Sequence, residues 1–429
     1  MYTSVRQGLQ GVPLSLRRLP RYLIGSDVSP TVVRLGLTSL FTDISSEMIS
    51  TILPLYLIFY LHLSPVQFGL IDGLYQGSSA LVRVFGGYAA DRWHRYKEVA
   101  GLGYFLSAIT KPLMLAVGGA WTAIAAIILI DRTGKGIRTA PRDALISLNS
   151  SPQQLGAAFG VHRTLDTLGA MLGPLVAFAI LSRLPNGFDV VFVVSFCAAL
   201  IGLSILALFV ENRTSTLVRT PKQPISWQSS LNLLRAPAFR KVVIAGGALA
   251  LATISDGFLY LELQRRLSFQ AAFIPLLYVL TSLSYLVLAV PFGRLADRIG
   301  RRFVFLGGYL LLLVVTVSLL LPSIGVPELF ACLAFFGAYY AATDGVLMAL
   351  ASELLTPELR TSGLALLGTA TGVAALFASL LFGAAWTAWG PDAAARLFAA
   401  GLVLALAFSV WSLLRPQYGR ALVTAHELA

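Results

Sequence analysis

Twelve apolar stretches follow one another along the chain, and they constrain its fold more than any other feature. About 20 mostly apolar residues are enough to cross a bilayer as a helix, whose backbone groups bind one another where no water is present. Apolar residues make up 57% of the chain and charged residues 12%, whereas soluble domains carry about a quarter charged residues. The sequence therefore predicts an all-α polytopic membrane protein. We place its twelve transmembrane helices at 33–60, 66–90, 99–118, 121–145, 156–182, 188–210, 241–261, 271–293, 303–321, 326–350, 361–386 and 391–415.

The formal net charge of +12 comes largely from short connections between these stretches. Cytoplasmic loops of membrane proteins are rich in Lys and Arg, so alternate connections are expected on the cytoplasmic side. This pattern predicts that both termini lie in the cytoplasm. It argues against nucleic acid as a partner, because no basic patch belongs to a soluble domain. The basic connections are 92–97, 211–240, 298–302 and the region of Arg415 and Arg420.

The long connection divides the chain into two halves of six spans. Cys197 and Cys332 lie inside apolar stretches, and no Cys/His spacing suits a metal. We therefore expect no cofactor and no metal, and we expect a monomer. The expected regions are a basic cytoplasmic tail (1–32), an N-terminal bundle (33–210), a cytoplasmic linker (211–240), a C-terminal bundle (241–415) and a cytoplasmic tail (416–429).

The two halves repeat each other. GYAADRWHRYK begins at Gly87 and GRLADRIGRR begins at Gly293, 206 residues later. SPQQLGAAFG begins at Ser151 and TPELRTSGLA begins at Thr356, 205 residues later. In the second pair a Ser or Thr precedes a Pro and opens a span, as at many helix N-termini. Such repeats predict a transporter whose site lies between the halves near the middle of the membrane.

These loops resemble the signature of the major facilitator superfamily, Gly-x-x-x-Asp-Arg-x-Gly-Arg-Arg, and the resemblance extends over the whole chain. In the first half His94 stands where the family has Gly. The resemblance implies that Asp91 and Arg95 act in a gate latch on the cytoplasmic face, whereas topology alone is the other explanation for the basic residues. The matching residues are Gly87, Asp91, Arg92 and Arg95 in the first half, and Gly293, Asp297, Arg298, Gly300 and Arg301 in the second.

The fourth span runs from apolar residues into DRTGKGIRTAPRDALI. Arg132 lies eleven residues past Trp121, or about 16 Å into the membrane at 1.5 Å per residue. The helix therefore continues through this stretch, and Asp131, Lys135, Arg138 and Arg142 form a charged stripe on one of its faces. The stretch resembles the superfamily motif Arg-x-x-Gln-Gly at Arg132 and Gly136, and it also resembles a bacterial branch with Asp-Arg-x-Gly-Lys-Gly-x-Arg followed by Pro-Arg-Asp-Ala-Leu.

The fifth span contains Gly169, Gly173 and Pro174. Their spacing resembles the superfamily's antiporter motif, Gly-x-x-x-Gly-Pro followed by Gly-Gly, although Ala177 and Phe178 replace the final pair. The resemblance implies an antiporter. Close packing of small residues between helices is an alternative explanation for the same pattern.

Several charged residues lie inside the predicted spans, where each is costly unless it is paired, hydrated or functional. An acid on the first span and an Arg on the fourth resemble the drug/proton antiporters of the superfamily. The proton-coupling candidates are Asp43, Glu47, Arg132 and Asp166. The candidates for a substrate cavity are Lys111, Lys135, Arg138, Arg163, Asp256 and Asp344. A structural network of ion pairs within the first bundle is the alternative for all of them.

These features favour a secondary transporter that exports a small organic solute in exchange for protons. The second hypothesis is a transporter of an anionic solute, which includes an importer. It requires basic groups in the fourth span that are not paired with carboxylates. A membrane sensor or a lipid-acting protein is a third. The four His residues form no constellation with a nucleophile or metal, so we do not expect an enzyme. The expected partners are a small solute, protons and the lipid bilayer.

Overall fold

The computed structural model describes residues 28–93, 95–151, 154–211, 232–321, 324–355 and 360–415. Both halves are helical in this part of the chain. The first half contains α3 (Pro30–Pro54), continued by the π-helix η1 (Leu55–Tyr60), α4 (Pro65–Trp93), α5 (Tyr96–Ala116), α6 (Trp121–Leu148), α7 (Leu155–Leu181) and α8 (Phe188–Phe209). The second half contains η2 (Leu233–Arg235), α10 (Pro237–Leu251), α11 (Asp256–Leu267), η3 (Ala271–Phe273), α12 (Ile274–Ile299), α13 (Arg301–Ser318), α14 (Val326–Ser352), α15 (Arg360–Trp389) and α16 (Pro391–Leu414).

The prediction of twelve helical spans is confirmed, with α10 and α11 together forming the seventh. In the described part of the chain, nine spans are long and apolar enough to cross a membrane. The remaining three, α3, α4 and α6, have the necessary length but carry more polar and charged residues. Polar groups inside a span cost free energy unless they have partners. We therefore expect the functional site to involve these three helices.

The seventh span differs from the continuous helix expected at 241–261. It breaks after Leu251, and a new helix starts at Asp256. The Ser255 side chain caps this start by accepting a hydrogen bond from the Phe258 amide at 3.5 Å. A hydroxyl that can satisfy a free amide makes a helix start possible inside a membrane, where water is absent. Discontinuous helices of this kind occur near the sites of many transporters.

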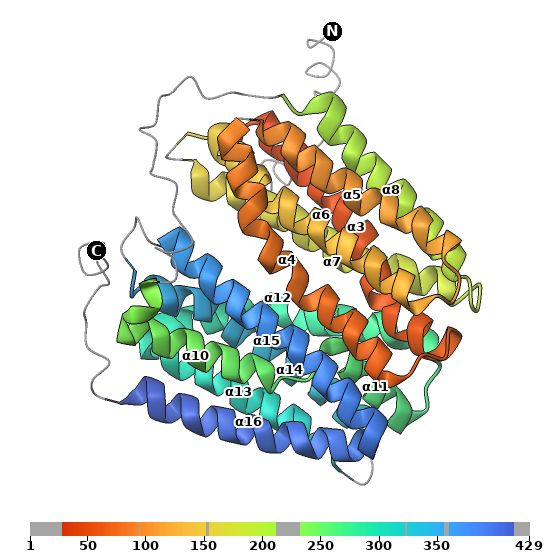
Figure 1. The fold of residues 1–429 in the computed structure, drawn as a ribbon, viewed down its shortest axis with the longest axis vertical. Coiled ribbons are helices and arrows are strands. Elements are labelled where there is room, and N and C mark those ends of the chain that lie inside the picture. The colour runs from red at the N-terminus through yellow and green to blue at the C-terminus, as the bar shows by residue number, and fades with distance from the viewer. Residues whose placement is uncertain are drawn as a thin grey trace, which may run out of the picture.

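The two halves form separate bundles that meet along a seam (Figure 1). We call the side at which α3 begins and α16 ends the terminal face, and the other side the opposite face. In the seam α4 packs against α15, and their backbones approach closely because glycines line the contact. A Cβ atom on Gly73 would lie 2.6 Å from the Leu376 carbonyl oxygen, and one on Gly69 would lie 2.5 Å from the Ser379 carbonyl oxygen.

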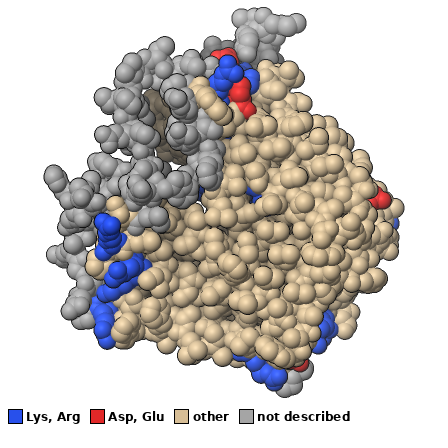
Figure 2. Space-filling model, viewed as in Figure 1, with Lys and Arg blue, Asp and Glu red and all other residues tan. Residues whose placement is uncertain are grey.

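These close contacts belong to the parts of α4 and α15 between the middle of the molecule and the opposite face. Four of the five buried residues of α12 lie in its first eight residues, toward the opposite face, and only Ala296 is buried near the terminal face. The halves are therefore packed together on one side, and α12 is more exposed on the other. Figure 2 shows a broad surface nearly free of charge, with Lys and Arg near its rims, as expected of a face toward lipid.

Candidate functional site

A buried ion cluster lies in the first bundle, where α5 and α6 meet. Lys111 Nζ of α5 lies 2.7 Å from Asp131 Oδ1 of α6, and the Arg132 guanidinium forms an ion pair with the other oxygen of the same carboxylate. The Arg132 guanidinium also stacks 3.8 Å from the centre of the Tyr75 ring of α4. All three charged side chains are buried. One carboxylate thus pairs with two cations, and the face of an aromatic ring stabilises the remaining positive charge through a cation–π interaction.

Small residues bring the helices of this cluster together. A Cβ atom on Gly134 would lie 2.6 Å from the Gly103 carbonyl oxygen of α5. A Cβ atom on Gly136 would lie 2.8 Å from the Ser79 carbonyl oxygen of α4. The glycines of GKG therefore allow α6 to pack closely against two neighbours, and Lys111 and Tyr75 are thereby positioned beside the charged stripe.

A second cluster joins α3, α6 and α7. The carboxyl groups of Asp43 and Asp166 interact directly with each other. Arg138 lies 3.9 Å from Asp43, and Arg142 and Arg163 lie 3.8 Å and 3.4 Å from Asp166. Neither acid is fully buried, since the side chains of Asp43 and Asp166 are 15% and 18% exposed. This arrangement can hold a proton between two carboxyl groups or pair them with arginines.

Two candidates lie between these clusters and have different surroundings. Glu47 accepts a hydrogen bond from the Ser50 hydroxyl at 2.7 Å. Lys135 is half-buried and lies near enough to Asp43 and Glu47 to interact electrostatically. Lys135 has no ion pair within 4.0 Å among the described residues, unlike the other cations of the fourth-span stripe. It is therefore the member of the stripe that is freest to meet a solute.

The second bundle contributes fewer charges. Asp256 begins α11 and accepts a hydrogen bond from the Tyr340 hydroxyl of α14. Asp344 of α14 lies near Arg163 of the first bundle, which also approaches Tyr285 of α12. Asp344 thus lies within electrostatic range of Arg163 across the halves but forms no ion pair with it within 4.0 Å, whereas Asp256 is hydrogen-bonded to a tyrosine.

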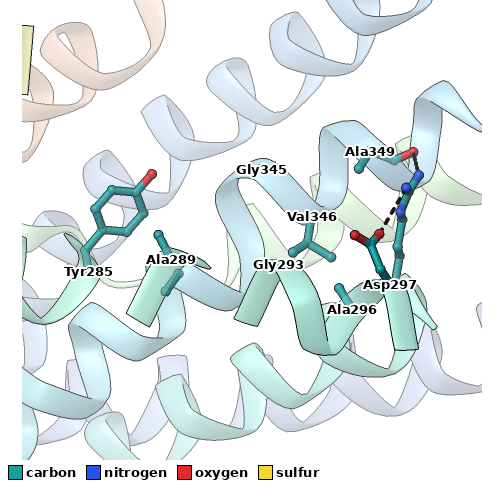
Figure 3. A pocket seen from close by; sticks show the side chains of 10 residues that line it. Tyr285, Ala289, Gly293, Ala296, Asp297, Gly345, Val346 and Ala349 are labelled. Atoms are coloured by element: carbon teal, nitrogen blue, oxygen red, sulfur yellow. Dashed lines mark hydrogen bonds and ion pairs between the residues drawn. The ribbon is translucent and has the colours of Figure 1, made fainter. Parts of the chain in front are cut away.

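A cavity of about 290 Å³ lies between α12 and α14 (Figure 3). Tyr285 marks one end, and Asp297 lies at the other, near the terminal face. Small residues of both helices line its length, among them Gly293 and Gly345. It is a corridor along the wall of the second bundle, leading from the region of Arg163 and Asp344 to the terminal face.

The gate-loop residues of the second half contact one another. Arg301 lies 3.2 Å from Asp297 and 2.9 Å from Glu353, and donates to the Ala349 carbonyl at 3.1 Å (Figure 3). Gly300 has φ +103°, which favours glycine and lets α12 turn sharply into α13. Arg298 is exposed. In the first half Arg95 is exposed, and the side chains of Gly87, Asp91 and Arg92 lie outside the described part of the structure, as do Pro152, Thr356 and both tails.

The glycines of the fifth span face the first span. A Cβ atom on Gly169 would lie 2.4 Å from the Leu40 carbonyl oxygen, and one on Gly173 would lie 2.8 Å from Glu47 Cβ. Pro174 is buried inside α7, and the helix continues past it. The spacing of these residues therefore positions α7 against the helix that carries Asp43 and Glu47.

The sequence does not point to one participant, Tyr75, or to the partners of two others, Asp131 and Asp72. Tyr75 was not anticipated, because an aromatic residue in an apolar span resembles ordinary core. Asp131 was noted in the stripe but not as the shared partner of Lys111 and Arg132, although its place directly before Arg132 was a usable signal. Asp72 accepts a hydrogen bond from Ser379 across the seam at 2.6 Å. An isolated acid in an apolar span was the signal for Asp72, but its partner is 307 residues away.

The family model described as the Major Facilitator Superfamily matches residues 35–281 and 247–428. Together with the fold, this match shows that the chain belongs to the Major Facilitator Superfamily and is a multi-pass secondary transporter, not an enzyme. Among curated proteins it is similar to an uncharacterised MFS-type transporter of Methanocaldococcus jannaschii, with 33% identity over 84% of this chain and 89% of the relative. It is also similar to the fosmidomycin resistance protein of Escherichia coli, with 24% identity over 86% of this chain and 91% of the relative.

Solved structures share the fold at low sequence identity. The nucleoside transporter NupG aligns with a TM-score of 0.74 and 16% identity, covering 90% of this chain and 100% of that one. A POT family transporter in complex with 5-aminolevulinic acid aligns with a TM-score of 0.75 and 14% identity, covering 91% and 97%. These likenesses establish the fold and leave the solute open.

Proposed function

We propose that the chain is a proton-coupled exporter of a small organic solute, working by alternating access in a bacterial inner membrane with both termini in the cytoplasm. The observation that supports this proposal is that the carboxyl groups of Asp43 and Asp166 interact with each other and that each has an arginine of α6 within 4.0 Å. Two adjacent carboxylates repel each other, so a proton bound between them stabilises the pair. When that proton leaves, Arg138 and Arg142 are close enough to neutralise the acids.

The location of this pair suits proton coupling. Asp43 and Asp166 lie on different helices, α3 and α7, and α7 also packs against α12 of the other half. A change in protonation therefore acts on a helix that contacts both bundles. Glu47 lies one turn along α3 and is a second coupling candidate, whereas Arg132 is already paired with Asp131. We accordingly assign Arg132 to holding the bundle and Asp43 with Asp166 to proton exchange.

Two further observations support the direction and the orientation. One relative is named a fosmidomycin resistance protein, and export is a route to drug resistance. At the opposite face, Arg265 and Arg266 are paired with Glu262 and Asp392, so their charges are neutralised. The excess of positive charge thus remains at the terminal face, which we assign to the cytoplasm.

The experiment has two stages. Purified protein is melted against matched panels of cationic, neutral and anionic compounds, because a ligand at a hundred times its Kd adds about 2.7 kcal/mol of stability. A stabilising compound is then followed in proteoliposomes under an imposed pH gradient. We expect Asp43→Asn with Asp166→Asn to abolish gradient-driven flux while Asp189→Asn, an exposed acid at the opposite face, leaves it unchanged. Unchanged pH dependence in the double variant would overturn the proposal.

An anionic solute is the second candidate, and Lys135 is the observation that favours it. Most basic groups of the first bundle are committed to carboxylates, which weakens a general anion site. Lys135 alone of the stripe is free to bind an anion. If only anions stabilise the protein and Lys135→Met removes that effect, the second candidate replaces the first.

A further inference from the structure

Asp72 of α4 lies at the seam between the halves and has no role in the proton exchange proposed above. It is 8% exposed. Its Oδ2 accepts a hydrogen bond from the Ser379 hydroxyl of α15 at 2.6 Å, and its carboxyl group lies close enough to the Ser255 side chain at the start of α11 to interact with it. Both partners belong to the second half. Asp72 therefore ties the two bundles together on the side of the opposite face.

A second carboxyl group lies beside it. Asp256 follows Ser255 directly and interacts electrostatically with Asp72. The next residue, Gly257, packs so closely that a Cβ atom there would lie 3.5 Å from Asp72 Oδ1 and 2.7 Å from the Phe68 ring. The break in the seventh span thus brings an acid of the second half to an acid of the first.

Neither acid has a cation. In the described part of the chain, Asp72 and Asp256 form no ion pair within 4.0 Å. The titratable groups that interact with the two acids are all acids or phenols: Glu47 of α3, Tyr260 of α11, Tyr278 of α12, and Tyr339 and Tyr340 of α14. Tyr75, one turn along α4, is also a phenol. The α11 helix dipole favours one negative charge at its N-terminus. Burying two uncompensated carboxylates is far more unfavourable than this dipole can offset.

We propose that Asp72 and Asp256 bind a proton between the two halves, and that this proton holds the opposite face closed. With one proton on the pair, a single charge remains for Ser379, Ser255, Tyr340 and the helix N-terminus to stabilise. Opening the seam separates Ser379 from Asp72 and hydrates both acids, so the proton is released to water at the opposite face. Acid on that side then favours closure. The inference rests on the alternating access proposed above but not on the coupling proton at Asp43 and Asp166.

The test measures the width of the opposite face and requires no solute. Spin labels are attached at Leu184→Cys of the first half and Val326→Cys of the second, both exposed near that face, in a background of Cys197→Ser and Cys332→Ala. Label-to-label distances are measured by pulsed EPR in lipid nanodiscs between pH 5 and pH 9. One bound proton changes the closed-to-open ratio by up to tenfold per pH unit. We expect the open population to grow as the pH rises.

Three variants make the assignment specific. Asp72→Asn with Asp256→Asn mimics the protonated pair, so the seam is expected to stay closed at every pH. Ser379→Ala keeps both acids but removes a hydrogen bond that only the closed seam makes, so the seam is expected to open at lower pH. This variant also serves if the double variant fails to fold. Asp189→Asn is the control, with the native response. Any of three results would overturn the inference. These are a pH response that persists in the double variant, an unchanged midpoint in Ser379→Ala, and a label-to-label distance that does not change with pH. None of these outcomes bears on flux coupled through Asp43 and Asp166.

Discussion

At the scale of single residues, charged side chains can be buried in the first bundle because several of them share a partner. Asp131 serves Lys111 and Arg132 together, and Tyr75 covers the outer face of the guanidinium. Arg138 donates to the Ser107 hydroxyl at 3.0 Å and stacks 4.7 Å from the Tyr104 ring centre. These partners lower the cost of burying the charges. Removing one of them is therefore more disruptive than the net contribution of any pair suggests.

Asp131→Asn is expected to destabilise the protein strongly, because it leaves Lys111 and Arg132 buried without their carboxylate. Loss of one partner of a buried pair costs about 3–5 kcal/mol. Thermal melting in detergent measures the effect. The matched control is Asp143→Asn, whose carboxylate pairs with Arg142 but is 37% exposed, and which should cost about 1 kcal/mol or less. Equal melting temperatures for the two variants would contradict this ranking.

At the scale of elements, glycines decide which helices can meet. Gly169 and Gly173 let α7 lie against α3, and the glycines of α4 do the same against α15. Each of these contacts is with backbone atoms, which cannot rotate away as a side chain could. The break before α11 is the other element-level feature, and it positions Asp256 at a helix start inside the membrane.

Gly169→Leu is expected to disrupt the packing of α7 on α3, since its Cβ would lie 2.4 Å from the Leu40 carbonyl oxygen. Overpacking of this kind costs about 1–3 kcal/mol or more. The yield of monodisperse protein on size exclusion and its melting temperature report the effect. A Cβ atom on Gly160 of the same helix would meet nothing within 4 Å, so Gly160→Leu should be tolerated. Similar losses in both variants would mean that helix packing is not the cause.

At the scale of the whole molecule, the two bundles are held together toward one face and are more exposed toward the other. The seam is held by backbone contacts of α4 and α15, by the hydrogen bond from Ser379 to Asp72, and by the packing of Phe68 against Phe258 with ring centres 4.8 Å apart. All of these must separate when the opposite face opens. The balance between the two states is therefore set by a small number of residues.

Gly73→Val is expected to force the halves apart at the opposite face, because its Cβ would lie 2.6 Å from the Leu376 carbonyl oxygen. Distances between labels at Leu184→Cys and Val326→Cys should lengthen relative to the unmodified seam. Gly247→Val, whose Cβ meets nothing within 4 Å, provides the control. An unchanged distance distribution in Gly73→Val would show that the seam does not govern opening.

Orientation in the membrane also belongs to the whole molecule. We expect a fluorescent protein fused after Ala429 to fold and fluoresce in bacterial cells, and alkaline phosphatase fused there to be inactive, because the terminal face carries the unpaired basic residues. A truncated fusion after Leu184, in the connection at the opposite face, should show the reverse. The opposite pair of results would invert the assignment.

The sequence by itself determined the class of protein, the twelve spans, their division into halves and the family. These properties depend on the lengths of the apolar stretches and on local motifs. Both directly determine how the chain inserts into a bilayer. It also indicated that Arg132 continues inside a helix. Only the tertiary structure decided which charges meet: Asp43 faces Asp166, Asp131 holds Lys111 and Arg132, and Asp72 reaches Ser379. Partners chosen by helix packing lie far apart in the chain, so no local pattern encodes them.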